Sequence, residues 1–374
     1  MGVLTEINRI VGAKIDLKAA IQGKGVAVAE SARIDAYPAL VQAITQGVVD
    51  VATADELSAK ASEANLGRCY RFTGVTDGTY TTNNIYVVES QDVLREYKPA
   101  PKAISSLPVG AKVKDTGTTY YGSPIIWQVA DKNHSGYPAN SVTLVAANIL
   151  KIAAFDAKES GNSDNNRRNN GNNRYALSNI RQWLNKSGSP WYVAQHSADA
   201  TPSSGNVSYN PYDGQSGFLT DFSAQMKAAL LDTTLTVAKA TVDGGGSESV
   251  VDKVFLLSKQ EVGFGSENSI VEGSLLALFS SDNSSRLCKP TANAVSNSTY
   301  TSSNLSASKN WYWWLRSPFS SYSHSVRYVD SGGRSFSDSA YYGADGVRPA
   351  LNLSSGILVS GSADSDGAYT IVWN

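Results

Sequence analysis

Between residues 311 and 353, two apolar runs enclose a segment of very different composition. The first run, residues 311–315 (WYWWL), has the residue types of a β-strand. The second, residues 347–353, reads as a short apolar strand around Arg348-Pro349. Between them, the 27 residues 319–345 hold eight Ser, four Tyr and three Gly, and no Lys or Glu. Tyrosine supplies large contact area at low entropy cost, and Ser and Gly supply adaptable hydrogen bonding, as in antibody binding loops.

We therefore predict that residues 319–345 form a displayed ligand-binding surface, with the remainder of the chain as its support. The tyrosines and Phe319 are the expected anchors, and neighbouring polar side chains would tune specificity. We expect alternate tryptophans of residues 311–315 to pack into the core, and Arg316 and Arg348 to belong to the scaffold. The predicted contact residues are Phe319, Ser320, Ser321, Tyr322, Ser323, His324, Arg327, Tyr328, Asp330, Ser331, Arg334, Ser335, Ser337, Ser339, Tyr341 and Tyr342.

Composition narrows the class of protein. The 374 residues are enough for two or three domains, and 41% hydrophobic content excludes a disordered chain. The net charge is -1 and the basic residues are scattered, so a nucleic-acid partner is not expected. No apolar run is long enough to span a bilayer, and the N-terminal residues lack the basic and apolar regions of a signal peptide.

The first hundred residues change their periodicity once. Residues 4–22 have helical spacing, and a second helix is predicted from Pro38. Residues 67–89 alternate with period two around a turn at Asp77-Gly78. Three prolines make residues 98–108 a predicted linker. The predicted parts are a helical attachment or oligomerisation module (1–65), a small β-unit (66–97), the linker (98–108) and a ligand-binding domain (109–374).

The large domain mixes strands and helices, which predicts an α+β fold. Residues 110–133 alternate as two strands and residues 141–151 as a third. Residues 160–174 are expected to form an Asn-rich loop. Helices are predicted at 175–185, where Ile180, Trp183 and Leu184 share a face, and at 220–231, where Thr220 or Asp221 is the expected N-cap; Ser258 and Glu261 form a possible capping box.

Two stretches resemble known families. The helical module around residues 18–44 (KGV…YP) followed by YRFTG…YVVE resembles modules of phage and prophage tail proteins. Residues 109–355 resemble a domain family of bacterial surface and phage proteins that is similar to the C-type-lectin-like fold of formylglycine-generating enzymes. The blocks that carry this second resemblance, in the family's order, are residues 126–129, 174–185, 217–219, 252–261, 313–318 and 346–353.

The resemblance implies both a fold and a mode of action. A C-type-lectin-like domain would carry its ligand surface on its final strands and loops. The same fold serves the variable proteins of diversity-generating retroelements, and residues 319–345 lie where their diversified region would be. The implied protein is a receptor-binding component of a phage or prophage tail, located on the virion tail or at a cell surface. Its implied partners are a bacterial-surface receptor (protein or glycan), other tail proteins and further copies of itself, with a trimer expected by analogy with tail fibres.

Residue patterns for catalysis are weak. His134, His196 and His324 lack the spacing of a zinc signature, and G-x-S-x-G is absent. Formylglycine-generating enzymes act through two cysteines, whereas the lectin-like part has only Cys288. We therefore expect binding without turnover and no cofactor, with calcium possible. A bacterial adhesin and a glycan-active surface enzyme stay open as alternatives, the enzyme requiring that carboxylates such as Asp330, Asp338 and Asp345 converge.

Overall fold

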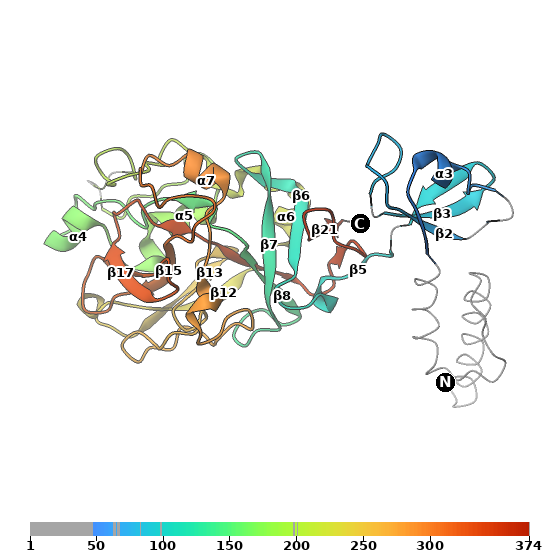
Figure 1. Ribbon diagram of the computed structural model, residues 1–374. Coiled ribbons are helices and arrows are strands. Elements are labelled where there is room, and N and C mark those ends of the chain that lie inside the picture. Colours follow the sequence, from blue (N-terminus) through green and yellow to red (C-terminus); the bar gives the residue numbers. More distant parts are fainter. Residues whose placement is uncertain are drawn as a thin grey trace, which may run out of the picture. The chain divides into compact units, whose positions relative to one another are not determined.

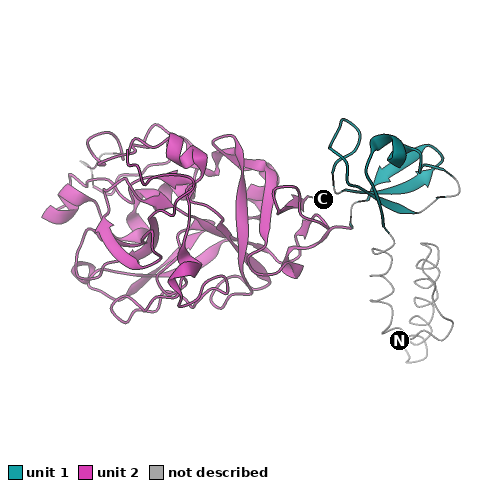
Figure 2. Ribbon diagram, in the orientation of Figure 1, with its two compact units in different colours: residues 1–99 teal, residues 100–374 magenta. Residues whose placement is uncertain are grey.

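The computed structural model describes residues 48–62, 65, 68–82, 84–97, 99–196, 199 and 201–373. The chain divides into two compact units, residues 1–99 and residues 100–374, drawn in teal and magenta in Figure 2. The helices predicted at 4–22 and from Pro38 lie outside the described residues. Within the described part of the chain, no helix has the length and apolar character needed to cross a bilayer.

The smaller unit contains a four-stranded sheet in the order β1-β2-β3-β4. Its strand β1 pairs in parallel with β2, and Leu57 of helix α3 is fully buried in the sheet's apolar core. The predicted boundary between residues 65 and 66 therefore falls inside this sheet, which begins before it. The elements are β1 (Val49–Val51), α3 (Ala54–Ser58), β2 (Cys69–Phe72), β3 (Ile85–Ser90) and β4 (Val93–Glu96).

The larger unit combines helices and strands and is mostly β, which confirms the α+β class. One sheet has eight strands in the order β14-β19-β8-β7-β6-β21-β20-β5. Its strands are β5 (Lys102–Ala103), β6 (Lys112–Tyr120), β7 (Ser123–Lys132), β8 (Ser141–Ala146), β14 (Val254–Phe255), β19 (Ala350–Ser354), β20 (Leu358–Val359) and β21 (Ala368–Val372). The strands predicted in residues 110–133 and 141–151 are confirmed by β6, β7 and β8.

A second sheet carries the predicted surface. It has five strands in the order β17-β16-β15-β18-β9, so β17 is an edge strand. In Figure 1, β15 and β17 lie at one end of the larger unit, close to helix α4, and away from β6 and β7. The strands are β9 (Lys151–Ile152), β15 (Trp313–Pro318), β16 (Ser325–Val329), β17 (Ser335–Ser339) and β18 (Gly346–Val347). Two short pairs, β10 (Ser187–Gly188) with β11 (Gly217–Phe218) and β12 (Thr233–Ala238) with β13 (Ser247–Asp252), complete the unit.

The predicted linker is largely part of the larger unit. Strand β5 pairs with β20, and the Ile104 and Leu107 side chains that follow it are fully buried in the main core. The three prolines suggested an extended connection. The apolar Ile104 and Leu107, spaced by one short helical turn, override that composition by packing under the sheet.

The helices predicted in the larger unit are present but shorter. Helix α5 (Asn179–Leu184) buries Ile180, Trp183 and Leu184, as expected. Helix α6 (Ala224–Ala229) is capped by Ser223, whose hydroxyl accepts from the Met226 amide, and not by Thr220 or Asp221. The Asn-rich loop contains a further helix, α4 (Asn165–Asn170), because the Asp164 carboxylate caps its first turn. Helix α7 (Ala292–Ser296) is the remaining α-helix described in this unit.

The tryptophans of the aromatic run anchor β15 from both sides. We expected alternate residues to be buried, but Trp311, Trp313 and Trp314 are all at most 4% exposed. The indole N–H groups of these three donate to the carbonyl oxygens of Ala344, Arg286 and Ala153, respectively, at 2.8–3.1 Å. The tryptophans therefore bury both faces of β15, and each of the three indole N–H groups has a hydrogen-bond partner, as buried donors require.

Candidate ligand-binding surface

The predicted surface is built on the β16–β17 hairpin. Strand β16 pairs antiparallel with both β15 and β17, with Val326 opposite Asp338 and Tyr328 opposite Phe336. The turn between the strands is closed by the Asp330 carboxylate, which accepts from the amides of Gly332 and Arg334 at 2.9 and 2.7 Å. Antiparallel pairing and a capped turn give this hairpin a fixed register on which side chains are displayed.

Asn173 supports the loop between β15 and β16, residues 319–324. Its fully buried side-chain amide donates to the carbonyl oxygens of Phe319 (3.4 Å), Tyr322 (2.6 Å) and Ser325 (3.0 Å). One side chain therefore reaches three carbonyls of this segment: those of Phe319 and Ser325 also accept from backbone amides, and that of Tyr322 depends on Asn173.

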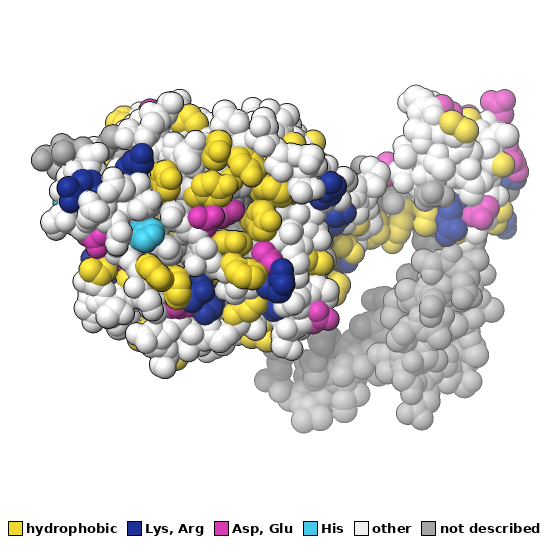
Figure 3. Space-filling view, turned by 60° about the vertical axis from the view of Figure 1, so that its left-hand side comes forward, with side chains coloured by type: hydrophobic (Ala, Val, Ile, Leu, Met, Phe, Trp, Pro, Cys, Tyr) yellow, Lys and Arg dark blue, Asp and Glu magenta, His cyan; other side chains and the backbone are white. Residues whose placement is uncertain are grey.

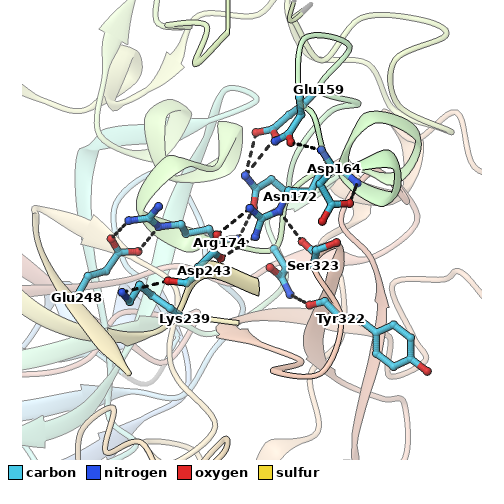
Figure 4. A network of polar contacts seen from close by, with 12 residues as sticks. Glu159, Asp164, Asn172, Arg174, Lys239, Asp243, Glu248, Tyr322 and Ser323 are labelled. Carbon is cyan, nitrogen blue, oxygen red and sulfur yellow. Dashed lines mark hydrogen bonds and ion pairs between the residues drawn. The ribbon is translucent and has the colours of Figure 1, made fainter. Parts of the chain in front are cut away.

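Arginines of the same Asn-rich segment extend this support (Figure 4). Arg167 donates through Nε to the Ser323 carbonyl at 3.0 Å, and its guanidinium binds both carboxylate oxygens of Asp243 at 2.8 and 2.6 Å. Arg174 makes the same two-pronged pair with Glu248 at 2.8 and 2.6 Å. These bidentate pairs connect the Asn-rich segment to two places: Asp243 lies in the turn after β12, and Glu248 lies in β13.

Glu267 holds the other side of the loop. Its carboxylate accepts from the Ser320 amide at 3.1 Å and from Arg327 at 2.8 and 2.9 Å, and pairs with Lys259 at 2.8 Å. Burial alone would raise the pKa of Glu267, but these donors and charges outweigh it and lower the pKa to about 2. Arg327 also stacks over the Phe319 ring at 4.1 Å. At neutral pH this carboxylate is thus a fixed negative anchor.

The predicted contact residues differ widely in exposure. Ser320, Ser323 and Asp330 are at most 8% exposed, so they support the surface and do not form it. The exposed ones are Ser321, Tyr322, Ser331 and Arg334, and the half-buried ones are Phe319, His324, Arg327, Tyr328, Ser335, Ser337, Ser339, Tyr341 and Tyr342.

The hairpin also divides these residues between two faces. Arg327 and Tyr328 are neighbours on β16, so their side chains point to opposite sides of the sheet. On one side, Phe319 contacts Tyr322, with ring centres 5.1 Å apart, and Tyr322 lies 5.9 Å from His324. The single continuous surface expected from composition is therefore two smaller ones, because a strand reverses its side chains at every residue.

The face that carries Tyr328 continues into a row of aromatic rings. Each member lies within 6.4 Å of the next, measured between ring centres. We call this set the aromatic row; it consists of Phe336, Tyr328, Tyr312, Trp311, Tyr300, Tyr342 and Tyr209. Phe336 and Tyr209 are 46% and 39% exposed, which leaves both ends of the row open to solvent.

Five of these rings were not predicted as contact residues, among them Trp311, which was assigned to the core. Tyr209 and Tyr300 are remote in sequence from residues 319–345, and only the fold brings them beside Tyr342. Tyr312 was assigned to the supporting strand. Phe336 lies inside the segment, and its period-two relation to Asp338 was the available signal that the two share a face.

Asp338 lies on the same face as Tyr328, and the Asp345 carboxylate, just before β18, is close to both. Burial raises the pKa of Asp338, and burial together with the neighbouring Asp338 raises the pKa of Asp345 well above its ordinary value. Both carboxylates also raise the pKa of the Tyr328 and Tyr342 hydroxyls, after the larger effect of burial. Asp330 does not join this pair, because its carboxylate is held by the turn and by Arg334.

A separate acidic cluster is the described group that most resembles a metal site. Ligand atoms of Glu159, His196 and Asp199 lie within 4.8 Å of one another. Calcium prefers an all-oxygen shell, so the imidazole nitrogen fits a transition metal better than the calcium considered from the sequence. The Asn172 amide already binds both Glu159 oxygens at 3.0 and 3.2 Å, and His196 binds Asp199 at 2.7 Å. The cluster is thus held by hydrogen bonds of its own.

This cluster makes a pH-dependent contribution to stability. Burial raises the pKa of Glu159 above its ordinary value of 4.5. The folded chain therefore binds this proton more tightly than the unfolded chain, and the stabilisation is fully present below about pH 4.3. It is lost as the pH rises through the raised, folded-state pKa.

In Glu159→Gln we expect a smaller decline in the free energy of unfolding between about pH 4.5 and 8. Urea unfolding at several pH values measures this decline, with the substitution of the exposed Asp232 by asparagine as control. If the free energy of unfolding declined equally with pH in the wild type and in Glu159→Gln, the raised pKa of Glu159 would be contradicted.

Comparison with known proteins adds a family and no function. Residues 140–355, more than half of the chain, match the family model described as "Domain of unknown function (DUF6273)". This match includes the hairpin, its supporting segment and the acidic cluster. No curated protein and no solved structure shows significant similarity to the chain. The chain belongs to the family of the domain of unknown function DUF6273.

Proposed function

We propose that this protein binds a receptor on the bacterial surface through the β16–β17 face of its larger unit, without chemical turnover. The proposal rests on one contrast: aromatic side chains are exposed in this region, while buried polar side chains hold its backbone in place. Tyr322 on one face, and Phe336 and Tyr209 on the other, are 52%, 46% and 39% exposed, while buried side chains fix the backbone nearby: Asn173 holds the Tyr322 loop and Asp330 the hairpin turn. Exposed aromatic side chains on a rigid base are the usual anchors of binding surfaces.

The resemblances supply the biological setting of the proposal. We propose a C-type-lectin-like fold for the larger unit and a place on a phage or prophage tail for the whole protein. Residues 1–97 would then attach it to other tail proteins or join copies of the chain. A homo-oligomer, by analogy with tail fibres a trimer, would multiply weak single sites into useful avidity. Sequencing the gene in many isolates tests whether residues 319–345 are diversified.

Binding of the fluorescent full-length chain to a panel of bacterial strains tests the function. We expect binding to at least one strain, and a loss of at least tenfold in apparent affinity for Tyr342→Ala or Phe336→Ala, because each removes a large contact. Tyr97→Ala is the matched control, because Tyr97 is 48% exposed on the smaller unit. Binding to no strain, or equal binding by all variants, would refute the proposal.

One observation favours a glycan-active enzyme as a second candidate. Asp338 and Asp345 are neighbouring carboxylates, and burial raises the pKa of each, as an acid catalyst requires. The same experiment separates the two functions. A receptor glycan recovered unchanged after prolonged incubation supports binding alone, whereas cleaved glycan with loss of cleavage in Asp338→Asn supports the enzyme.

A further inference from the structure

The carboxylate pair of the aromatic face lacks a positive partner. Among the ion pairs of the described residues, none includes Asp338 or Asp345. The arginines of the hairpin form ion pairs with other carboxylates: Arg327 with Glu267, and Arg334 with Asp330. Elsewhere in the larger unit, acidic side chains such as Asp243 and Glu248 have an arginine each. The pair on the aromatic face therefore lacks the positive partner that would stabilise its ionised form.

Asp345 shows this lack of compensation most clearly. Its side chain belongs to a residue that is 2% exposed, and its Oδ2 atom has no hydrogen-bond partner. A buried acceptor without a donor costs free energy, and buried carboxylates in native proteins are normally paired. Asp338 is similarly poor in partners: among the described residues, its Oδ1 accepts from the neighbouring Ser339 amide, at 2.7 Å. A positive group supplied from outside would relieve both carboxylates.

The rings around the pair are suited to such a group. Asp338 and Phe336 share the side of β17 that faces the same way as Tyr328, and the carboxylates influence the hydroxyls of both Tyr328 and Tyr342. The faces of aromatic rings attract cations, and aromatic cages with a carboxylate recognise ammonium groups. Figure 3 turns this end of the larger unit forward and shows an acidic side chain bordered by hydrophobic ones.

We propose that the aromatic face binds an organic ammonium group of the ligand, seated on Asp338 in front of the buried Asp345 and flanked by Tyr328, Tyr342 and Phe336. This inference rests on the proposed function, because it names the chemistry that the same surface recognises. Carboxylates supply the charge, and the rings exclude water and provide cation–π attraction. A primary amine and a quaternary ammonium share this chemistry and differ in the hydrogen bonds that they donate.

Choline and its uncharged isostere 3,3-dimethylbutanol provide the test, using the full-length chain and isothermal titration or ligand-observed NMR. We expect choline to bind and dimethylbutanol to bind at least tenfold more weakly, because the two differ only in charge. Methylamine in place of choline shows whether a primary amine is preferred. Equal binding of choline and dimethylbutanol, or no binding of either ammonium compound, would overturn the inference.

Variants locate the site. Asp338→Asn is expected to weaken binding of the preferred ammonium compound at least tenfold, and Phe336→Leu to weaken it less, while Asp232→Asn leaves it unchanged. Wild-type affinity in Asp338→Asn would overturn the proposed position. Binding to cells without binding of any ammonium compound would support the receptor function and refute this inference. Binding of choline that depends on Asp338, without binding to any cells, would support the ammonium site and refute the receptor function.

Discussion

Replacing Arg316 with methionine is expected to lower the free energy of unfolding of the larger unit by about 3–5 kcal/mol, because it leaves a buried carboxylate without its counter-charge. Arg316 and Glu261 are 1% and 0% exposed, and the guanidinium binds the two carboxylate oxygens at 2.5 and 2.6 Å. The same guanidinium also donates to the carbonyl oxygens of Leu256 (3.0 Å) and Glu272 (2.7 Å). Methionine fills much of the volume but satisfies none of these acceptors.

Chemical denaturation of purified variants measures this effect. Arg168→Met is the matched control, since Arg168 is exposed and a surface substitution changes stability by about 0.5 kcal/mol or less. Adding Glu261→Gln to the Arg316 variant is expected to restore part of the loss, because the amide is neutral. Its oxygen can still accept from Tyr137, as Glu261 does at 2.7 Å. Equal stability of Arg316→Met and Arg168→Met would contradict the role of this ion pair.

Local patterns in the sequence predicted the parts of the fold that local physics decides. The two hydrogen bonds of the capping box are confirmed, although they close a turn and not the start of a helix: the Glu261 amide donates to the Ser258 hydroxyl at 3.2 Å, and the Ser258 amide donates to the Glu261 carboxylate at 2.9 Å. The buried face of α5 and the buried positions of Arg316 and Arg348 are confirmed as well. Each of these depends on residues close in sequence or on an evident apolar context.

Features that depend on distant contacts were not predicted. Ile104 and Leu107 read as part of a linker until the pairing of β5 with β20 places them in the core. Tyr209 and Tyr300 have no local feature that marks them as partners of Tyr342, because this contact joins three separate loops. The candidate surface was therefore found in sequence by composition, while its faces, its acids and its supporting side chains required the fold.

Asn173→Leu is expected to release the loop that carries Tyr322, because it removes one buried amide that donates to three carbonyl oxygens at 2.6–3.4 Å. The Phe319 and Ser325 carbonyls keep backbone donors, whereas the Tyr322 carbonyl loses the donor that the structure gives it. Leaving such acceptors unpaired in the interior costs about 1–3 kcal/mol for each group that finds no water. We expect the free energy of unfolding to fall by about 2–3 kcal/mol.

Hydrogen exchange followed by mass spectrometry gives the more specific readout for this variant. Amides of residues 319–325 are expected to exchange at least tenfold faster, while those of β8 (Ser141–Ala146) keep wild-type rates, since local opening exposes only the segment that lost its support. Asn169→Leu is the matched control, because Asn169 is exposed and bonds only within its own helix, to Asn165. Unchanged exchange in residues 319–325 would show that Arg167 and Glu267 suffice to hold the loop. Faster exchange confined to this loop, together with weaker cell binding, would tie the displayed surface to a side chain that no ligand touches.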